Sequence, residues 1–218
     1  MSSRTVTKLA RLPRQPVDKF AERRAELAEA TLQTLSELGY ARTSLREIAQ
    51  NSAFTHGVLH YYFTDKFDLI LCSVRQYKAH CVTRYDEVTA RATSADELLE
   101  GFLSALAITL REEGHLHRLW YDIRAQAMFE VAFRTDVAEI DKSLEDMIWR
   151  IVSRLAELGG VTLGVTPSAA YAAIDGLFQN YLLKHLCGDP GAIHNMQADV
   201  RLVMTRIAGG AARSGPRT

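Results

Sequence analysis

The side chains best suited to chemistry gather in one short segment near the N-terminus. Residues 54–66 read FTHGVLHYYFTDK and hold two histidines, two tyrosines and a lysine. His56 and His60 are four residues apart, so a helix would place both imidazoles on one face, where they could share a metal ion. No third ligand follows, and the pair His115 and His117 shows no cysteine or carboxylate at ligand spacing. We therefore expect no metal site, and the imidazoles are better suited to hydrogen-bonding a partner.

A helical wheel divides this segment into two faces. At about 100° per residue, one half of a helix that begins at His56 is apolar and the other half is polar or small. The inward half holds Val58, Leu59, Tyr62 and Phe63, and the outward half holds His56, Gly57, His60 and Tyr61. Glycine inside so short a helix costs up to about 1 kcal/mol relative to alanine. Close approach of a partner to Gly57 would explain this cost.

Lys66 stands at the start of the next expected helix, which Thr64 could cap and in which Asp65 would occupy the first turn. A cation in a first turn opposes the helix macrodipole by about 0.3 kcal/mol or more. A bound phosphate would reverse the sign, because backbone N–H groups and the ammonium would converge on one anion. A lysine that is simply solvated is the alternative.

The elements before this segment complete a recognisable arrangement. Residues 17–38 carry apolar side chains at helical spacing, and Gly39 is a typical helix stop. The S-x-x-E pattern at Ser44 is a capping box that begins a short second helix. A tight turn at residues 52–54 and a cap at Thr55 then begin the third helix. Two short helices joined by a tight turn are typical of a helix-turn-helix, whose second helix enters the DNA major groove.

Residues 27–70 resemble the TetR family of bacterial transcriptional regulators. They read LAEATLQTLSELGYARTSLREIAQNSAFTHGVLHYYFTDKFDLI and match that family's long first helix, its G-Y/F-x-x-T-S/T joint, its helix-turn-helix and the closing L-x-Y-x-F-x-x-K. The resemblance implies a homodimer whose paired N-terminal domains bind successive major grooves of a palindromic double-stranded DNA operator. It also implies a divergent C-terminal domain that binds a small-molecule effector. Within this family a repressor released by its effector is the first expectation, and an activator is the alternative.

The resemblance also implies which residues approach DNA. By position, the base-contacting residues are Arg46, Thr55, His56, Gly57 and His60. The phosphate-contacting residues are Thr43, Ser44, Tyr61, Tyr62 and Lys66. The chain departs from the family at His60, where tyrosine is usual, and at Tyr62, where histidine is frequent, so whether His56 or His60 reads a base stays open. The side-chain chemistry agrees, because histidine, threonine and arginine bond base edges whereas tyrosine and lysine suit phosphate oxygens.

The whole chain favours an all-α fold. It has 218 residues, of which 47% are hydrophobic, and only five prolines, so a sizeable core of uninterrupted helices is possible. The three cysteines form no C-x-x-C pair and indicate neither a disulfide framework nor a structural zinc site. No apolar run approaches the roughly 18 residues of a membrane span, and the N-terminus lacks a secretory signal. We therefore expect a cytoplasmic protein with no membrane partner and no cofactor.

Charge and proline positions predict how the chain is divided. Residues 1–66 hold ten lysines and arginines against seven carboxylates, which favours a polyanion at this end. We predict a flexible basic arm at 1–17 that either contacts DNA or stays free, a helix-turn-helix domain at 18–66, a ligand-binding and dimerisation domain at 67–209 and a disordered tail at 210–218. Together these parts contain about nine helices.

The C-terminal part has the composition of a ligand-binding helical domain. Its expected helices are 65–92, 94–113, a helical segment at 115–133 after a break at Gly114, 136–159, 168–187 and 193–207. A mostly apolar wall with a few polar groups suits a small-molecule pocket, whereas an ordinary core with arginines at its edge is the alternative. The candidate effector-binding residues are His117, Trp120, Tyr121, Arg124, Met128, Phe129 and Gln179. The aromatic groups favour an apolar or aromatic effector, and Arg124 would suit an acidic group on it.

The last two helices are candidates for a dimer interface. The helix at 168–187 is apolar over most of its circumference, so it needs cover on two sides. Two antiparallel helices from each subunit would form a four-helix interface by twofold symmetry. The candidate interface residues are Ile174, Leu177, Tyr181, Val200, Val203 and Ile207. Gln179, Asn180 and His185 would lie either in this interface or in the pocket.

Two other classes of protein remain as alternatives to a DNA-binding regulator. An enzyme is the first, but the sequence contains no G-x-S-x-G, no glycine-rich phosphate loop and no H-E-x-x-H. A helical protein with a purely protein-interaction role is the second. Binding to DNA through Tyr61 and Lys66 separates the regulator from both alternatives.

Overall fold

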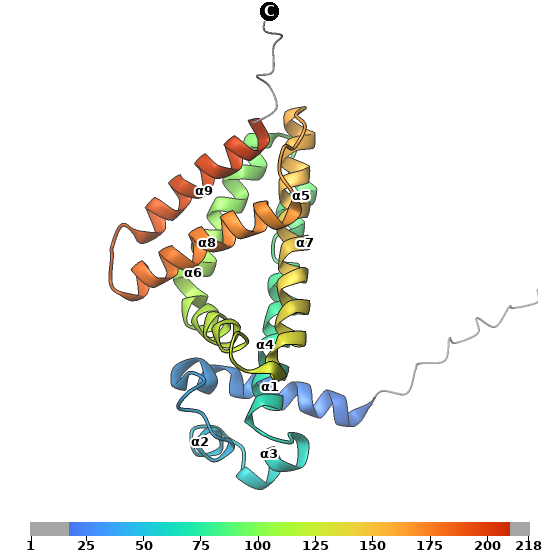
Figure 1. Cartoon of the computed structure of the whole chain (residues 1–218), viewed down its shortest axis with the longest axis vertical. Helices are drawn as coiled ribbons and strands as arrows, with labels where there is room; N and C mark the ends of the chain where they lie inside the picture. Colours follow the sequence, from blue (N-terminus) through green and yellow to red (C-terminus); the bar gives the residue numbers. More distant parts are fainter. Residues whose placement is uncertain (1–17, 210–218) are drawn as a thin grey trace, which may run out of the picture.

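The computed structural model describes residues 18–209, and all regular elements in this part of the chain are helices (Figure 1). The elements are α1 (Lys19–Leu38), α2 (Leu45–Gln50), α3 (His56–Tyr62), α4 (Lys66–Cys81), α5 (Asp86–Arg91), α6 (Ala95–Gln126), the short 3-10 helix η1 (Val131–Phe133), α7 (Arg134–Gly159), α8 (Pro167–Leu186) and α9 (Ala192–Gly209). The all-α prediction is confirmed for these residues. The predicted basic arm at 1–17 and tail at 210–218 lie outside them.

The first three helices form a small unit at one end of the molecule (Figure 1). Asp18 begins α1 by accepting hydrogen bonds from the N–H groups of Phe20 and Ala21, and Gly39 ends the helix with φ 71°, a conformation that favours glycine. Ser44 and Thr55 cap α2 and α3, as predicted, through bonds from the third backbone N–H after each cap. These caps fix where the two short helices begin, and the turn between the helices follows from them.

The predicted long fourth helix is wrong, because the chain turns after Cys81. The structure has α4 ending at Cys81, a turn, and then the separate helix α5. The turn lets two residues enter the core: Arg84 donates to Glu113 at 2.6 Å, and Tyr85, which is 5% exposed, packs on Phe102. The N-cap of α4 is Asp65 and not the predicted Thr64. The side chain of Asp65 accepts a hydrogen bond from the backbone N–H of Asp68.

The predicted helix break at Gly114 is wrong as well. α6 runs without interruption from Ala95 to Gln126, and Gly114 lies inside it. A Cβ atom at Gly114 would lie 3.2 Å from Cδ1 of Leu182 on α8, a tighter contact than side chains normally make. The glycine is therefore explained by close packing of two helices, which outweighs its poor helix propensity.

The larger unit packs α7, α8 and α9 around the long helix α6. The predicted apolar stripe of α7 is buried, which confirms it: Ile140, Leu144, Met147, Ile148, Ile151 and Leu155. Thr166 caps α8 and Pro167 follows at its first position, as predicted. The last two helices, α8 and α9, lie side by side at the C-terminal end (Figure 1). None of the helices in residues 18–209 is both long and apolar enough to cross a membrane.

Three of the six predicted dimer-interface residues belong to the protein's own core. Ile174 is 2% exposed, Tyr181 5% and Val200 0%, so none of them can reach a partner from the surface. Leu177, Val203 and Ile207 are partly buried and pack against the same core. The apolar side chains that α8 and α9 leave exposed are instead Leu183, Leu186 and Leu202.

One face of α6 joins the two units. His115 bonds the Gln33 side chain at 3.0 Å, Arg118 donates to the carbonyl of Ser36 at 2.6 Å, and Asp122 accepts from the N–H of Tyr40 at 2.8 Å. The three α6 residues are spaced at i, i+3 and i+7, so they share one side of the helix. Beside them Phe67, Phe133 and the Tyr40 ring pack together, with centroids 5.0 to 5.7 Å apart. The end of α1 is therefore fixed directly to α6.

Candidate nucleic-acid interface and internal cavity

The outward face of α3 is mostly exposed, although the ring of Tyr61 lies edge to face with that of Phe20 on α1, with centroids 6.1 Å apart. His56, Gly57 and His60 are exposed, and Tyr61 is 71% exposed, whereas Leu59 and Phe63 are fully buried. The two-faced helix predicted from the wheel is therefore confirmed. The rings of His56 and His60 lie edge to face with centroids 4.3 Å apart, and nothing would contact a Cβ atom added at Gly57. This face can accept a flat or grooved partner close to its backbone.

Arg24, which the sequence did not single out, holds the far end of α3 in place. Its guanidinium donates to the carbonyl of Tyr62 at 2.8 Å and makes a bidentate pair with Asp68 on α4. Burial alone would raise the pKa of the Asp68 carboxyl, but hydrogen bonds from Arg24 and from the N–H of Thr64 outweigh it and lower the pKa. Arg24 also lies 4.8 Å from the ring of Phe63. One side chain of α1 thus fixes α3 relative to α4.

The predicted phosphate-contacting residues are in different environments. The ammonium of Lys66 lies beside the first turn of α4 and 4.4 Å above the ring of Tyr40. Tyr61 is exposed, whereas Tyr62 is half-buried with its ring 5.0 Å from that of Phe20. Thr43 is 3% exposed, and its hydroxyl donates to the carbonyl of Gly39. Its hydroxyl is therefore already used within the protein.

The remaining predicted contact residues lie around the same surface. Arg46 is exposed on α2, while Ser44 and Thr55 use their hydroxyl oxygens to cap α2 and α3. These two hydroxyls can still donate, because a cap uses only a lone pair of the oxygen. Arg42, which the sequence did not single out, is exposed at the start of the same surface. The surface therefore presents arginines, imidazoles and a phenol around α3.

A second candidate site is an internal cavity of about 60 Å³ between α4, α6, α7 and α8. Most of its wall is apolar, with Leu106, Leu144, Met147, Ile148 and Phe178. Its polar part contains Lys78 and His117, which are 2% and 9% exposed. The ammonium of Lys78 lies 3.2 Å from Nδ1 of His117, and burial lowers the pKa of Lys78 to about 8.

The other charged groups on the cavity wall have partners. Arg84 donates to Glu113 and Thr109, and Glu113 also accepts from the hydroxyl of Tyr77 at 2.7 Å. Asp175 accepts from the hydroxyl of Tyr121 at 2.8 Å and pairs with an arginine. Lys78 alone among these charged wall groups pairs with no carboxylate in the described chain. It lies instead 5.1 Å from the ring of Trp120.

Arg124, which the sequence offered as the partner of an acidic effector, already has carboxylate partners within the chain. Its guanidinium pairs with Asp175 at 2.5 Å and with Asp141 at 3.2 Å, so the charge is already neutralised. Arg124 faces an open surface groove of about 610 Å³, which Met128 and Gln179 also line. Tyr121 and Asp175 line both hollows. They therefore form the partition between the groove and the internal cavity.

The predicted effector-binding residues are consequently not brought together in one place. His117 and Tyr121 line the cavity, and Tyr121, Arg124, Met128 and Gln179 line the groove. Trp120 is 1% exposed and supports Lys78 from behind, whereas Phe129 is 80% exposed and lines neither hollow. The sequence did not single out Lys78, although its spacing from Val74 and Cys81 places it on the buried stripe of α4. A lysine on an apolar stripe is the signal that could have found it.

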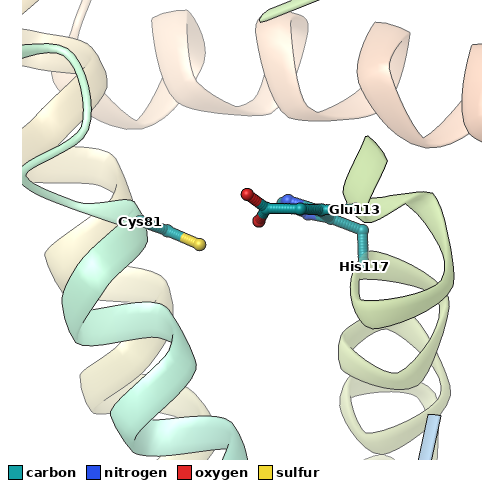
Figure 2. A group of neighbouring side chains, drawn as sticks. All are labelled: Cys81, Glu113 and His117. Carbon is teal, nitrogen blue, oxygen red and sulfur yellow. The ribbon is translucent and has the colours of Figure 1, made fainter. Parts of the chain in front are cut away.

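A cysteine, a glutamate and a histidine also meet beside the cavity (Figure 2). Cys81 on α4 points toward Glu113 and His117 on α6, and one ligand atom from each residue lies within 4.8 Å of the others. In residues 18–209 this is the one group of three such side chains close enough to share a metal ion. His115 and His117, considered as a metal-binding pair in the sequence, point to different places. His115 bonds Gln33 between α6 and α1, whereas His117 faces the cavity.

The geometry of residues 18–209 defines a class of protein: an all-α fold with a helix-turn-helix followed by a larger helical unit that holds a cavity. Residues 27–71 match the family model described as bacterial regulatory proteins, tetR family. Over these residues, which contain α2 and α3, the chain is similar to the TetR family.

Relatives and solved structures agree with this assignment. The HTH-type transcriptional regulator BetI of Paraburkholderia xenovorans is 40% identical over 53 residues, 24% of this chain and 27% of the relative. BetI of Paraburkholderia phymatum is 27% identical over 114 residues, 51% of this chain and 58% of the relative. This chain thus spans about half or less of the length of these curated relatives.

The solved structures resemble the chain over most of its length but at low identity. A TetR transcription regulator from Haloarcula marismortui superposes with a TM-score of 0.69 at 19% identity, covering 85% of this chain and 98% of that chain. The regulator FadR from Bacillus subtilis, solved in complex with stearoyl-CoA, gives a TM-score of 0.66 at 16% identity over 82% of this chain and 96% of that chain. These likenesses establish the fold.

Proposed function

We propose that this protein is a ligand-responsive DNA-binding transcriptional regulator that binds a palindromic operator as a homodimer. The observation that carries the proposal is the outward face of α3, with His56, Gly57, His60 and Tyr61 exposed on a helix-turn-helix. A face of this size and chemistry fits the major groove, where imidazoles can bond base edges. We expect the exposed phenol of Tyr61 and the ammonium of Lys66 to contact phosphates beside this groove.

The dimer is proposed to form through α8 and α9. These helices leave Leu183, Leu186 and Leu202 exposed at 63%, 44% and 56%, next to the small exposed residues Ala172 and Gly176. Small residues on a helix surface let a second helix approach closely, and the leucines then lose their contact with water. A twofold axis through this face would bring four helices together and set the spacing of the two α3 helices.

The effector is proposed to enter the larger unit and to change that spacing. FadR, which shares the fold, was solved with stearoyl-CoA, so this arrangement of helices can hold an acyl ligand. In this chain α6 lines the cavity with His117 and Tyr121, and its other face is bonded to the end of α1. A ligand that moves α6 would therefore move the DNA-binding unit. The simplest outcome is that the ligand releases a repressor from its operator. Such a regulator would act in the cytoplasm and would catalyse no reaction.

A gel-shift titration of purified protein on its own promoter region tests the DNA-binding proposal. Wild type is expected to form a discrete complex that contains two chains, and Lys66→Glu is expected to lose it by replacing a phosphate attraction with a repulsion. Lys142→Glu on α7, far from α3, is the matched control and should bind like wild type. Equal binding by the Lys66→Glu variant, or no complex with any fragment of the promoter region, would refute the proposal.

A further inference from the structure

The buried ammonium of Lys78 lacks an anionic partner. Its contacts within the described chain are Nδ1 of His117 at 3.2 Å and the rings of Trp120 and Tyr77, whose centroids lie 5.1 and 5.3 Å away. Aromatic faces and one imidazole nitrogen stabilise a cation only in part, and a buried charge normally has a counter-ion. An ammonium has three N–H donors, so donors remain after the bond to His117.

His117 offers a second unused donor at the same place. Burial first, and then the charge of Lys78, hold the pKa of His117 well below its usual value, so the imidazole is neutral. Because an ammonium can only donate, Nδ1 of His117 must accept and Nε2 must carry the proton. This Nε2 is buried and has no hydrogen-bond partner among the described residues. A ligand oxygen in the cavity would satisfy it.

The same tautomer argues against a metal ion at Cys81, Glu113 and His117. A protonated Nε2 cannot be a ligand, and Nδ1 is occupied by Lys78. The carboxylate of Glu113 is already neutralised by Arg84 and bonded by the hydroxyl of Tyr77. The uncompensated ammonium of Lys78 beside the cluster also repels a metal cation. The electrostatics of this corner therefore favour an anion.

We infer that the internal cavity binds a small organic acid, with the carboxylate of the ligand held by Lys78 and Nε2 of His117 and its apolar body held against Leu106, Met147 and Phe178. This inference rests on the proposed function, because it names the class of effector. The ligand is compact, since 60 Å³ of free space, at about 10–15 Å³ per water-sized group, accommodates only a handful of heavy atoms. Met147 is flexible and extends this limit by changing its rotamer.

The direct test is calorimetric titration of the full-length protein, without DNA, with acids and their neutral amides. Butyrate, hexanoate and benzoate are compared with butyramide, hexanamide and benzamide, which match them in shape but carry no charge. We expect at least one acid to bind about tenfold or more tightly than its amide, as for a charge-assisted hydrogen bond. Lys78→Met should abolish this preference, while Lys142→Met, which removes an exposed lysine, should keep it.

Three results would overturn the inference. The first is no saturable binding of any of the acids up to about 10 mM. The second is equal binding of acid and amide, or an unchanged preference in the Lys78→Met variant. The third is tight binding of zinc chloride that Cys81→Ser removes, together with no binding of acids, which would assign the corner to a metal. The titration contains no DNA, so it is independent of the gel-shift test. Failure to bind acids would not refute operator binding, and failure to bind the operator would not refute acid binding.

Discussion

At the scale of single residues, the main finding is a charge buried at a cost. Lys78 is fully buried, and burial lowers its pKa from 10.5 to about 8. A base with a lowered folded pKa binds its proton less tightly in the folded state, so it destabilises the fold below pH 8, and the penalty disappears as the pH rises toward 10.5. Keeping this ammonium charged in the folded protein lowers the free energy of unfolding by about 3 kcal/mol, and this figure already includes the favourable contacts with His117 and Trp120.

Replacing Lys78 with methionine should therefore stabilise the protein at neutral pH. Methionine fills a similar volume without a charge, and we expect a gain of about 1–2 kcal/mol, or roughly 2–8 °C in Tm. Between pH 8 and 10.5 the stability of wild type should approach that of the variant, because Lys78 loses its proton in this range. The neighbouring groups are present in both proteins, so their titration affects both: His117, Arg84, Glu113 and Asp175. Differential scanning calorimetry measures both effects. A lower Tm for Lys78→Met at pH 7 would contradict the assignment of a buried, uncompensated ammonium.

Arg24 supplies the second prediction at this scale. Arg24→Met removes the pair with Asp68 and the bond to the carbonyl of Tyr62, and it leaves a half-buried carboxylate without its partner. We expect a loss of about 2 kcal/mol in the free energy of unfolding, together with weaker operator binding because α3 is no longer fixed. Arg23→Met is the control on the same helix, since Arg23 pairs with the exposed Glu26 and lies 6.0 Å from the ring of Phe54 but makes no buried ion pair. Urea denaturation compares the two, and equal losses would mean that the Arg24 network is unimportant.

At the scale of helices, local signals predicted more than long-range contacts did. The caps at Ser44, Thr55 and Thr166 and the two faces of α3 depend on neighbouring residues, and sequence reasoning located all of them. The missed features depend on other helices: Gly114 continues α6 because Leu182 packs on it, and α4 ends at Cys81 because Tyr85 fits beside Phe102. The cavity was missed for the same reason, since its wall comes from four helices and no single helix reveals that Lys78 meets His117.

Gly101 allows a test of such helix packing. A Cβ atom there would lie 2.6 Å from Cγ1 of Val88 on α5, and valine has few rotamers with which to move away. We expect Gly101→Ala to destabilise the protein by about 1–3 kcal/mol, although alanine is the better helix former. Gly57→Ala, where a new Cβ atom would meet nothing within 4 Å, is the control and should be neutral or stabilising. Thermal unfolding followed by circular dichroism distinguishes them, and a stabilised Gly101→Ala would show that α5 is free to shift.

At the scale of the whole molecule, α4 and α6 both join the helix-turn-helix unit to the larger unit, and one continuous hydrophobic core runs through both. α6 lines the cavity with His117 and Tyr121 and bonds the end of α1 with His115, Arg118 and Asp122. A displacement of α6 would therefore reach Tyr40, whose ring contacts Lys66 at the start of α4. On the α6 side the joint consists of three hydrogen bonds beside an aromatic cluster, so substitutions at the hydrogen-bonding side chains weaken it.

Weakening this joint should separate the unfolding of the two units. Asp122→Ala removes the acceptor of the Tyr40 N–H, and Arg118→Ala removes the donor to Ser36. We expect the double variant to show an early calorimetric transition from the helix-turn-helix unit, whereas wild type unfolds in one transition. Asp122→Asn retains an acceptor and should behave nearly like wild type. A single, unshifted transition in the double variant would mean that the units are coupled elsewhere.

The central claim is that the outward face of α3 binds DNA, and the affinity of Tyr61→Ala tests it most directly. Tyr61 is 71% exposed, so its removal leaves the core intact and changes only the surface offered to a partner. The measurement is fluorescence anisotropy of labelled promoter DNA at fixed salt, with the dimer checked by sedimentation. We predict at least about tenfold weaker binding by a dimer of unchanged stability. Equal affinity of the variant and wild type would contradict the claim.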